Sequence, residues 1–455
     1  MQTDTPRMEP DSWLLGSANA LRRDQLGTYE RAMLDHGDVV GFRVGPPKVG
    51  FEFDAVFHPD GAREVLASRA GDFVKDAPAF TELARLIGYG LATSDGDLWR
   101  RDRRLLAPLF TPRQIASYIG PTTDVAIEHV ERWRAAADVD DVIDLDATAL
   151  DYALAVLGRT VFGADIVRAA ATLRASLLVV SEYAKQRGLA PVRLPAWLPT
   201  PANRRALRAR DDLNDLVDDL VARRRAAEGG RPDLLNLLLD ARDPETGVAL
   251  DDREVRDQVL IFLIAGHETS WATLAFTLHL LGAHPDVQAR VRAEVTDVVG
   301  TERIELDHVK QLTYTQQVID ESMRLYPPVH TVLRRATRDT EVLGRAVPAG
   351  RIVGVSLWGI HHNPAIWPDP YRFDPDRFAS GDHHRYSHIP FGGGPRSCIA
   401  ADLAIAELAI AVATVVSTFE LRSLVDEPEL DVAVTIRPKG PLPCRFQPLD
   451  GRHST

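Results

Sequence analysis

A chain of 455 residues, with 45% hydrophobic and 26% charged side chains, has the composition of a globular protein with a large core. Its formal net charge of -12 argues against a general nucleic-acid binder, whose affinity would depend on a basic surface. The only cysteines are Cys398 and Cys444, too few for a disulfide scaffold, as is usual in a reducing cytoplasm. We therefore expect a cytoplasmic protein that binds no nucleic acid.

The ends of the chain and its breaks suggest one folding unit. Met1 to Gly16 is polar and acidic, so it has neither the apolar core of a signal peptide nor a membrane anchor. The Pro- and Gly-bearing breaks at Gly188 to Pro201 and Glu228 to Pro232 are short, so we interpret them as interhelical loops. We expect a single domain over residues 1–455 with flexible polar termini.

Helical patterns outnumber strand patterns along the chain. Apolar residues at helical spacing predict helices, and β-branched runs predict strands. In chain order the predicted elements are a strand at Val39 to Val44, a helix from near Gly96 to before Pro108, helices at Arg204 to Arg225, Val255 to Leu281 and Tyr314 to Leu325, a strand at Val353 to Leu357, irregular chain over much of Asn363 to Pro390, and a helix at Ala401 to Val416. The predicted fold class is mainly α with small β-sheets, an α+β pattern.

The longest helical pattern runs from Asp257 to His284 and would be about 40 Å long. Gly266 to Ser270 interrupts its apolar run, so it is not a membrane span. His267 begins an HExxH zinc pattern, but Trp271 stands where the second histidine is needed, which excludes that site. Glycine inside a helix costs about 1 kcal/mol relative to alanine, so the helix either tolerates buried polar residues or opens at Gly266 beside a reaction site.

A glycine-rich loop, Phe391 to Ala400, presents Cys398 directly before the last predicted helix. Unpaired helix amides and the helix dipole favour a thiolate there, which is a metal ligand. The glycines let a flat, bulky group approach the backbone, and Arg396 offers a planar fork of donors to a carboxylate on that group. A heme fits this description. Alternatively, a lone cysteine before a helix is a packing residue, whereas a P-loop is disfavoured because its Lys-Ser/Thr pair is missing.

The spacing of Phe391, Gly394, Arg396 and Cys398 resembles the heme-binding signature of the cytochrome P-450 superfamily. The resemblance covers motifs from about Trp99 to Glu407. It implies the cytochrome P-450 fold, with a long central helix over heme b, iron protoporphyrin IX, and Cys398 as the axial ligand of its iron. Ala400 replaces the glycine that usually follows the cysteine by two residues, which leaves heme affinity and redox tuning open.

The segment from Ala265 to Ser270 resembles the oxygen-activation segment of the same superfamily. This resemblance implies that Ala265 and Gly266 lie over the heme. It also implies that Thr269 hydrogen-bonds the oxygen being activated, while Glu268 helps to pass protons to it through water. Threonine alone would be weak support, because its hydroxyl often bonds back to the preceding turn of its helix.

Glu321 and Arg324 resemble the ExxR element of the superfamily, with Arg377 as the later arginine partner. The implied role of all three is structural, in fixing the region that carries the cysteine loop. An acid and a base three residues apart more often lie on a solvated helix face.

Trp99 and Arg103 lie four residues apart, so they share one side of a helix and resemble the WxxxR helix of the family. There the indole N–H and the guanidinium contact the heme propionates, which otherwise lack counter-charge. Arg334 is a third candidate for these carboxylates. Ordinary packing and surface roles for Trp99 and Arg103 remain open.

Together these motifs predict a heme-thiolate monooxygenase that activates O2 with two externally supplied electrons and hydroxylates or epoxidises a hydrophobic small molecule, such as a natural product. No flavin or nicotinamide module is evident, and the resemblance to soluble bacterial members implies ferredoxin and ferredoxin reductase as electron donors. Two alternatives are a heme-thiolate sensor or binding protein and a redox-neutral heme isomerase. The pair of Glu268 and Thr269 favours oxygen activation over both.

Two surfaces follow by analogy with the family. Arg100, Arg101 and Arg104 would give the cysteine side a positive surface for an acidic ferredoxin. The segment from Phe80 to Leu91 would form a lid over the substrate, and Val179 to Trp197 a roof. The residues expected to line a mostly apolar substrate pocket are Phe80, Phe262, Ala265, Val329, His330 and Val332.

Overall fold

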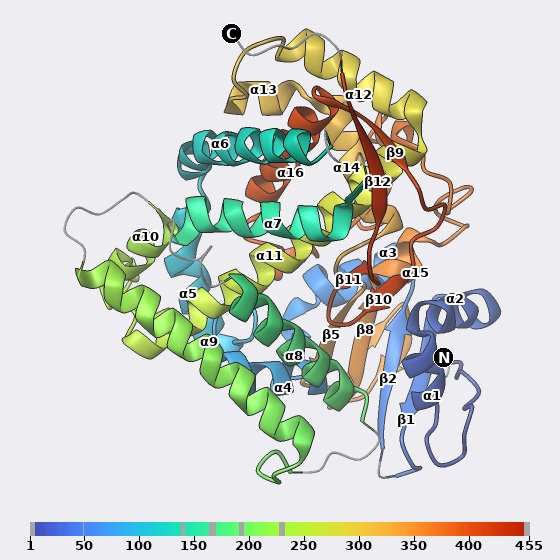
Figure 1. Ribbon diagram of the computed structural model, residues 1–455. Coiled ribbons are helices and arrows are strands. Elements are labelled where there is room, and N and C mark those ends of the chain that lie inside the picture. The colour runs from blue at the N-terminus through green and yellow to red at the C-terminus, as the bar shows by residue number, and fades with distance from the viewer. Residues whose placement is uncertain are drawn as a thin grey trace.

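A computed structural model describes residues 5–48, 50–137, 142–162, 170–190, 195–226 and 233–449. The predicted flexible ends, residues 1–4 and 450–455, lie outside these ranges, as does the whole predicted loop from Glu228 to Pro232. The chain is mainly helical with small sheets, as the sequence predicted. In Figure 1, helices fill the left and upper parts of the view, and the largest sheet lies at the lower right.

The helices of the described ranges are α1 (Ala18–Arg23), α2 (Gln25–His36), α3 (Pro59–Arg63), α4 (Pro78–Ile87), α5 (Gly96–Leu106), α6 (Pro112–Ala137), α7 (Leu145–Leu157), α8 (Ala170–Gly188), α9 (Pro201–Ala226), α10 (Leu234–Asp240), α11 (Asp252–Ala283), α12 (Pro285–Val298), α13 (Leu306–Gln311), α14 (Thr313–Leu325), α15 (Leu357–His361) and α16 (Ala401–Val416). Short turns of 3-10 or π type include η1 (Glu64–Ser68), η6 (Pro375–Phe378) and η7 (Gly394–Arg396).

The strands are β1 (Val39–Val44), β2 (Phe51–Val56), β3 (Phe73–Val74), β4 (Val142–Asp144), β5 (Thr331–Ala336), β6 (Thr340–Val342), β7 (Arg345–Val347), β8 (Ile352–Ser356), β9 (Phe419–Ser423), β10 (Leu430–Val432), β11 (Ile436–Pro438) and β12 (Pro443–Pro448). The largest sheet has the order β1-β2-β8-β5-β3, in which only β2 and β8 run parallel.

This five-stranded sheet is covered on both faces. In the pair of β1 with β2, Phe42 lies opposite Phe53, and their rings stack with centroids 5.0 Å apart. Tyr29 and Met33 of α2 pack on this face, and Val65 and Leu66 of η1 pack in a second cluster that holds Val353 and Val355 of β8. All of β8 is buried, which explains why its sequence is a β-branched run without alternation.

The central helix α11 is longer at its start than the predicted helix. Asp251 caps it with a capping box, in which its side chain accepts from Glu254 N–H and the Glu254 side chain accepts from Asp251 N–H. The helix continues without interruption through Gly266, so it does not open there. A Cβ at position 266 would lie 3.0 Å from Cδ1 of Leu157, so this glycine lets α7 pack closely against α11.

Among the described residues, α11 is the one helix long and apolar enough to span a membrane, and 78% of its most apolar window is buried inside the protein. It lies in a core with α6, α7, α8, α9, α14 and α16. The alanine-rich sequence of α16 suits this position because small side chains let helix backbones approach each other. Cys444 in β12 is fully buried in the same core, where burial raises the pKa of its thiol to about 12.

Candidate active site

The cysteine loop is closed by a backbone hydrogen bond from Cys398 N–H to the Phe391 carbonyl at 2.9 Å. Gly394 has a φ of 67°, and a Cβ there would lie 1.8 Å from the carbonyl oxygen of Leu66. This glycine is therefore required where the loop packs on η1, a contact that the sequence did not predict. Ala400 has a φ of -105°, which any residue adopts, so its methyl group causes no backbone strain.

The Cys398 side chain is exposed. Burial of its surroundings raises the pKa of the thiol, while a hydrogen bond from the Ala400 backbone and the charge of Arg103 lower it. The net effect is a raised pKa, contrary to the thiolate that the sequence predicted, and of these contributions only those of Ala400 and Arg103 act in the predicted direction. Ala265 is also exposed, although it lies in the middle of the largely buried α11. Cys398 and Ala265, two positions predicted to border the heme, are thus both exposed.

Three cations near the loop share one carboxylate, and we call Lys75, Asp95, Arg334 and Arg396 the cation cluster. Arg396 donates to the Ser94 carbonyl at 3.1 Å and pairs with Asp95. Lys75 Nζ donates to the Ala92 carbonyl at 2.7 Å. The Arg334 side chain, in a residue 6% exposed, has one hydrogen bond within the described part of the chain, to the Leu333 carbonyl at 2.9 Å.

Burial is the largest cause of the shifted pKa values of Lys75 and Arg334 in this cluster. It lowers the pKa of Arg334 to about 10, with a further contribution from Arg396, and lowers that of Lys75 well below its usual value. An excess of buried positive charge is costly unless an anion compensates it. The two carboxylates of a heme would supply that compensation, so the residues present fit this cofactor. Lys75 and Asp95 were not predicted; Asp95, as the N-cap of α5, carried a capping signal in the sequence.

The predicted pair on α5 contacts the cysteine loop. The Trp99 ring lies 4.2 Å from Cζ of Arg396, and Arg103 Nη1 donates to the Ser397 carbonyl at 3.0 Å. Trp99, Arg103 and Arg396 thus form one layer beside Cys398. Trp99 and Arg103 lie one helical turn apart on the same side of α5. That side packs against the loop that carries Arg396, two residues before Cys398.

Glu321, Arg324 and Arg377 meet as the family resemblance implied, and we call them the Glu321 clamp. Arg324 Nε donates to Glu321 Oε2 at 2.6 Å, and Arg377 Nε lies 3.3 Å from Glu321 Oε1. The side chains of Glu321 and Arg324 are both 0% exposed, so this pair does not lie on a solvated face. Arg324 also donates to the carbonyls of His361 and Pro370 at 2.8 and 2.7 Å. The clamp thereby ties α14 to the irregular chain before the cysteine loop.

Glu268 and Thr269 project in different directions from α11. Thr269 Oγ1 donates to the Ala265 carbonyl at 2.7 Å, back along its own helix. The Glu268 carboxylate accepts from Ser181 Oγ of α8 at 3.1 Å and from Thr435 Oγ1 at 3.0 Å. Burial raises the pKa of Glu268, and the charge of Arg437 opposes this. No direct hydrogen bond joins Glu268 to Thr269 among the described contacts.

Phe80 and His330 line one cavity between the five-stranded sheet, α4, α8 and the turn from β10 to β11. Its wall is mostly apolar. The His330 ring contacts Thr331 Oγ1 at 3.0 Å and the Ala433 carbonyl at 3.3 Å, and burial lowers its pKa to about 4. The other polar side chains on this wall are Gln25, Tyr29 and Lys185.

The other predicted pocket residues, Phe262, Ala265, Val329 and Val332, do not line this cavity. The Phe262 ring instead packs against Phe110, with centroids 5.9 Å apart. The predicted roof is partly placed, because residues 191–194 lie outside the described ranges.

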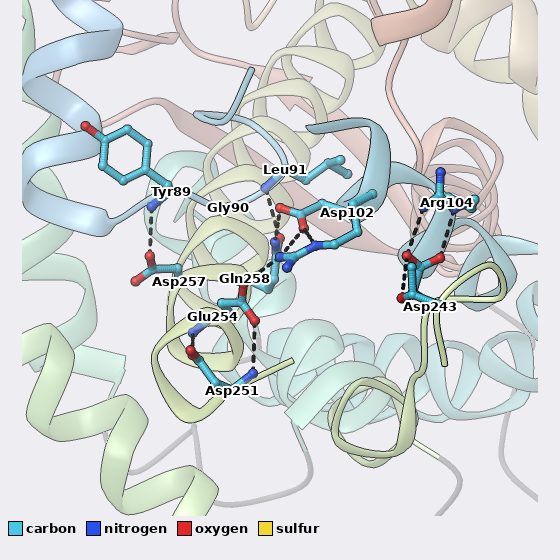
Figure 2. A network of polar contacts seen from close by, with 12 residues as sticks. Tyr89, Gly90, Leu91, Asp102, Arg104, Asp243, Asp251, Glu254, Asp257 and Gln258 are labelled. Atoms are coloured by element: carbon cyan, nitrogen blue, oxygen red, sulfur yellow. Dashed lines mark hydrogen bonds and ion pairs between the residues drawn. The ribbon is translucent and has the colours of Figure 1, made fainter. Parts of the chain in front are cut away.

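The end of the predicted lid is bonded to α11, as Figure 2 shows. Tyr89 N–H donates to Asp257 at 2.8 Å, and Leu91 N–H donates to Gln258 Oε1 at 2.9 Å. Gln258 in turn donates to Asp102 of α5 at 2.9 Å. These bonds fasten the segment after α4 to the central helix, so only its earlier part is left to act as a lid.

The arginines proposed as a ferredoxin surface are all paired within the chain. Arg101 contacts Asp102 and Glu254 at 2.9 and 2.6 Å, and Arg104 contacts Asp243 at 2.8 Å (Figure 2). Arg100 pairs with Asp97, one turn earlier on α5. The expected uncompensated positive surface is therefore absent at these three positions, because carboxylates from α5, α11 and the chain after α10 neutralise it.

Comparison with known proteins bears on this site as a whole. The family model described as "Cytochrome P450" matches residues 6–444. Cyclooctat-9-en-7-ol 5-monooxygenase of Streptomyces melanosporofaciens is 38% identical over 441 residues, covering 96% of this chain and 93% of the relative. Cyclooctatin synthase of the same organism is 34% identical, covering 90% and 88%. Leukotriene-B4 omega-hydroxylase 3 of Mus musculus is 30% identical, covering 98% and 90%. The chain belongs to the cytochrome P450 family and is a heme-thiolate monooxygenase that depends on O2 and electron-transfer partners.

Proposed function

We propose that this monooxygenase hydroxylates or epoxidises a hydrophobic natural product of secondary metabolism, with electrons from a ferredoxin and its reductase. For hydroxylation, one turnover converts substrate RH, O2, two electrons and two protons into ROH and water. The observation that carries the substrate class is the similarity to the bacterial relative named for cyclooctat-9-en-7-ol, an unsaturated alcohol. The mostly apolar cavity lined by Phe80 and His330 agrees with an apolar substrate, although none of its lining residues belongs to α11 or to the cysteine loop.

The proposed iron ligand is Cys398. The family cofactor needs a thiolate, and the chain has two cysteines, of which Cys444 is fully buried in β12. When bound, the heme supplies the O–O cleavage and the oxidising power. Residues of the chain would hold it: the cation cluster and Arg103 would pair with its carboxylates, and the cysteine loop and α11 would flank its ring. The proposed cofactor contacts are Trp99, Arg103, Arg334, Arg396, Phe391, Gly394, Ala265 and Gly266, with Lys75 added.

Thr269 and Glu268 are the proposed catalytic residues. Two observations support this role. The segment from Ala265 to Ser270 resembles the oxygen-activation segment of the family, and Ala265, one turn before Thr269, is exposed. In this proposal the Thr269 hydroxyl leaves the Ala265 carbonyl to bind the oxygen being activated. Thr269→Ala should then divert electrons into hydrogen peroxide, whereas Thr269→Ser should retain coupling. Unchanged product per electron in the alanine variant would remove this role.

The proposed partners and organisation follow the bacterial relatives. We infer a single catalytic domain, supported by a main core that extends from Leu83 to Phe446. We also infer a cytoplasmic enzyme, supported by the two unpaired cysteines and by the burial of α11.

The decisive experiment combines ligand binding with product analysis. The purified holoenzyme is titrated with unsaturated polycyclic alcohols, including cyclooctat-9-en-7-ol, and a heme spin-state change identifies binders. Binders are then incubated with ferredoxin, reductase and NADPH, and products are analysed by mass spectrometry. We expect a product heavier by one oxygen atom. A bound ligand that is never converted would instead indicate a binding protein, and an isomer formed without electrons would indicate an isomerase.

A further inference from the structure

A group of largely buried polar side chains lies beside the Glu268 segment of α11, and we call His267, Trp271, Asp146 and Arg437 the His267 cluster. The ring centroids of His267 and Trp271 lie 5.9 Å apart, and Cζ of Arg437 lies 5.9 Å from the Trp271 ring. Asp146 comes from α7 and Arg437 from β11. The cluster therefore fills the space between α11, α7 and the β10–β11 hairpin.

Polar atoms in this cluster lack partners in the described part of the chain. Both ring nitrogens of His267 and Nη1 of Arg437 are buried without a hydrogen bond, while the Trp271 indole and the Asp146 carboxyl interact with each other. His267 and Trp271 are only 1% and 2% exposed. Unpaired polar groups at this depth are rare, and ordered water molecules usually satisfy them. Several such atoms in one place indicate a hydrated chamber.

The chamber contains donors as well as acceptors, which suits a chain of water molecules. Burial, then the charges of Arg174 and Arg437, lowers the pKa of His267 to about 4. The neutral ring offers one donor and one acceptor. Burial raises the pKa of Asp146 to about 6, and Arg174, Trp271 and Arg437 oppose this. The described residues contain no group of histidine, cysteine or carboxylate side chains able to hold a metal ion.

The chamber also has a connection to solvent and a connection to Glu268. Arg437 donates to Asp431 Oδ2 at 2.9 and 2.6 Å, and the two side chains are 12% and 34% exposed. Thr435, two residues before Arg437, donates to Glu268 Oε2 at 3.0 Å. The charge of Arg437 opposes the rise that burial causes in the pKa of Glu268, so the guanidinium lies near this acid as well as beside Asp431.

We propose that the His267 cluster is the route by which protons pass from solvent at the Asp431–Arg437 pair to Glu268, with His267 as the positioning residue that holds the water chain. The proposal rests on the proposed proton-delivery role of Glu268. Each turnover consumes two protons with two electrons and one O2, so the buried site must import protons. Neither Ser181 nor Thr435 provides a path to the surface, since each hydroxyl is itself buried.

The test compares two ways of driving the holoenzyme. With ferredoxin and reductase, the two protons come from solvent. With hydrogen peroxide, RH and H2O2 give ROH and water, so peroxide brings its own electrons and protons. His267→Phe should lower the ferredoxin-driven rate roughly tenfold and raise its solvent isotope effect, with little change in the peroxide-driven rate. His267→Gln, which keeps a donor and an acceptor, should recover most of the rate. Equal losses in both assays would overturn the proposal.

A second variant covers the possibility that His267→Phe does not fold. Asp431→Asn removes the charge at the solvent end and should change the same two rates in the same direction. Glu429→Gln is its matched control, because Glu429 pairs with Lys439 on the same hairpin at 3.0 Å with side chains 75% and 65% exposed. The control should change neither rate. An Asp431→Asn enzyme that behaves like the control overturns the route.

A readout independent of turnover is a high-resolution crystal structure of the enzyme. Ordered water molecules bonded to His267 and continuing toward Arg437 are expected, and a dry chamber would contradict the route. Glu268→Gln separates this proposal from its premise. If that variant keeps its full ferredoxin-driven rate, the role of Glu268 fails; if it loses the rate while His267→Phe does not, only the route fails.

Discussion

Two buried arginines of this enzyme have opposite surroundings. Arg324 of the Glu321 clamp is 0% exposed, and its guanidinium makes five hydrogen bonds, all to groups of this chain. Arg334 of the cation cluster is 6% exposed and makes one, to the neighbouring carbonyl. A buried charge that the chain itself satisfies holds the fold together. A buried charge that the chain leaves unsatisfied prepares for a group from outside, and we propose that this group is a heme carboxylate.

The largest expected effect is in the clamp. Arg324→Ala removes the partner of the buried Glu321 carboxylate, and such a loss costs about 3–5 kcal/mol. Urea unfolding should show a fall of that size in the free energy of unfolding. Arg385→Ala, at an exposed arginine, is the control and should change stability little. A clamp variant as stable as the control would end the contrast between the two arginines.

Glu407 offers an intermediate case, because its buried carboxyl has one side-chain partner, Ser270 Oγ at 3.3 Å. Burial raises its pKa from 4.5 to about 8, and Ser270 opposes this. The folded state therefore favours the protonated acid. The stability that Glu407 contributes to the fold is fully present below pH 4.5 and is lost as the pH rises toward 8.

Glu407→Gln should abolish this loss, which is on the order of 2–4 kcal/mol. Urea unfolding of both proteins between pH 5 and pH 9 checks it. The free energy of unfolding of the wild type should fall with rising pH relative to that of the variant. The difference should then level off near the raised pKa of Glu407. Parallel curves for the two proteins would show that Glu407 is not protonated in the fold.

A smaller effect is expected from replacing Arg334, and it should stabilise the heme-free protein but weaken heme binding in the holoenzyme. Arg334→Met removes an uncompensated buried charge, so the heme-free protein should gain about 1 kcal/mol in the free energy of unfolding. The holoenzyme should lose heme to an acceptor protein roughly tenfold faster, because a carboxylate loses its partner. Arg334→Lys keeps the charge and should lie between. A heme-free protein destabilised by the methionine would place Arg334 with Arg324 among the structural arginines.

The smallest effect is expected at the pair of Arg101 and Glu254, which lies in the region drawn in Figure 2 and whose side chains are both 29% exposed. The double variant Arg101→Gln, Glu254→Gln keeps the net charge, so its reduction by ferredoxin should change less than about twofold. Stopped-flow reduction at low and high salt measures this. If Arg101 itself touches ferredoxin, the double variant should be as slow as Arg101→Gln alone.

Much of the architecture could be predicted because periodic burial leaves a pattern in the sequence. The strand at Val39 to Val44 has its predicted bounds, and the helix at Ala401 to Val416 likewise. The strand β5 was not predicted, since Arg334 and Arg335 interrupt its apolar run. Those arginines are tolerated there because one faces the cation cluster and the other bonds to Asp76 and Gly350 carbonyls.

The candidate site was predicted where a motif fixes short spacings and missed where distant segments meet. Glu321, Arg324 and Arg377 could be named from the sequence, and the structure brings them together. Lys75 could not, because its charge matters only beside Arg334, more than 250 residues away. Gly394 was expected to admit a flat group, whereas the structure shows that the carbonyl of Leu66 also requires it. These are tertiary contacts, which a local pattern does not encode.

The burial of Cys444 gives the enzyme a built-in gauge of cofactor content. A thiol sealed in the core does not react with an alkylating reagent until the chain unfolds, whereas Cys398 is exposed in the structure described here. If iron occupies the Cys398 sulfur, the native holoenzyme presents no reactive thiol and the heme-free protein presents one. Counting labelled cysteines by mass spectrometry would therefore report directly the fraction of molecules that have lost their heme.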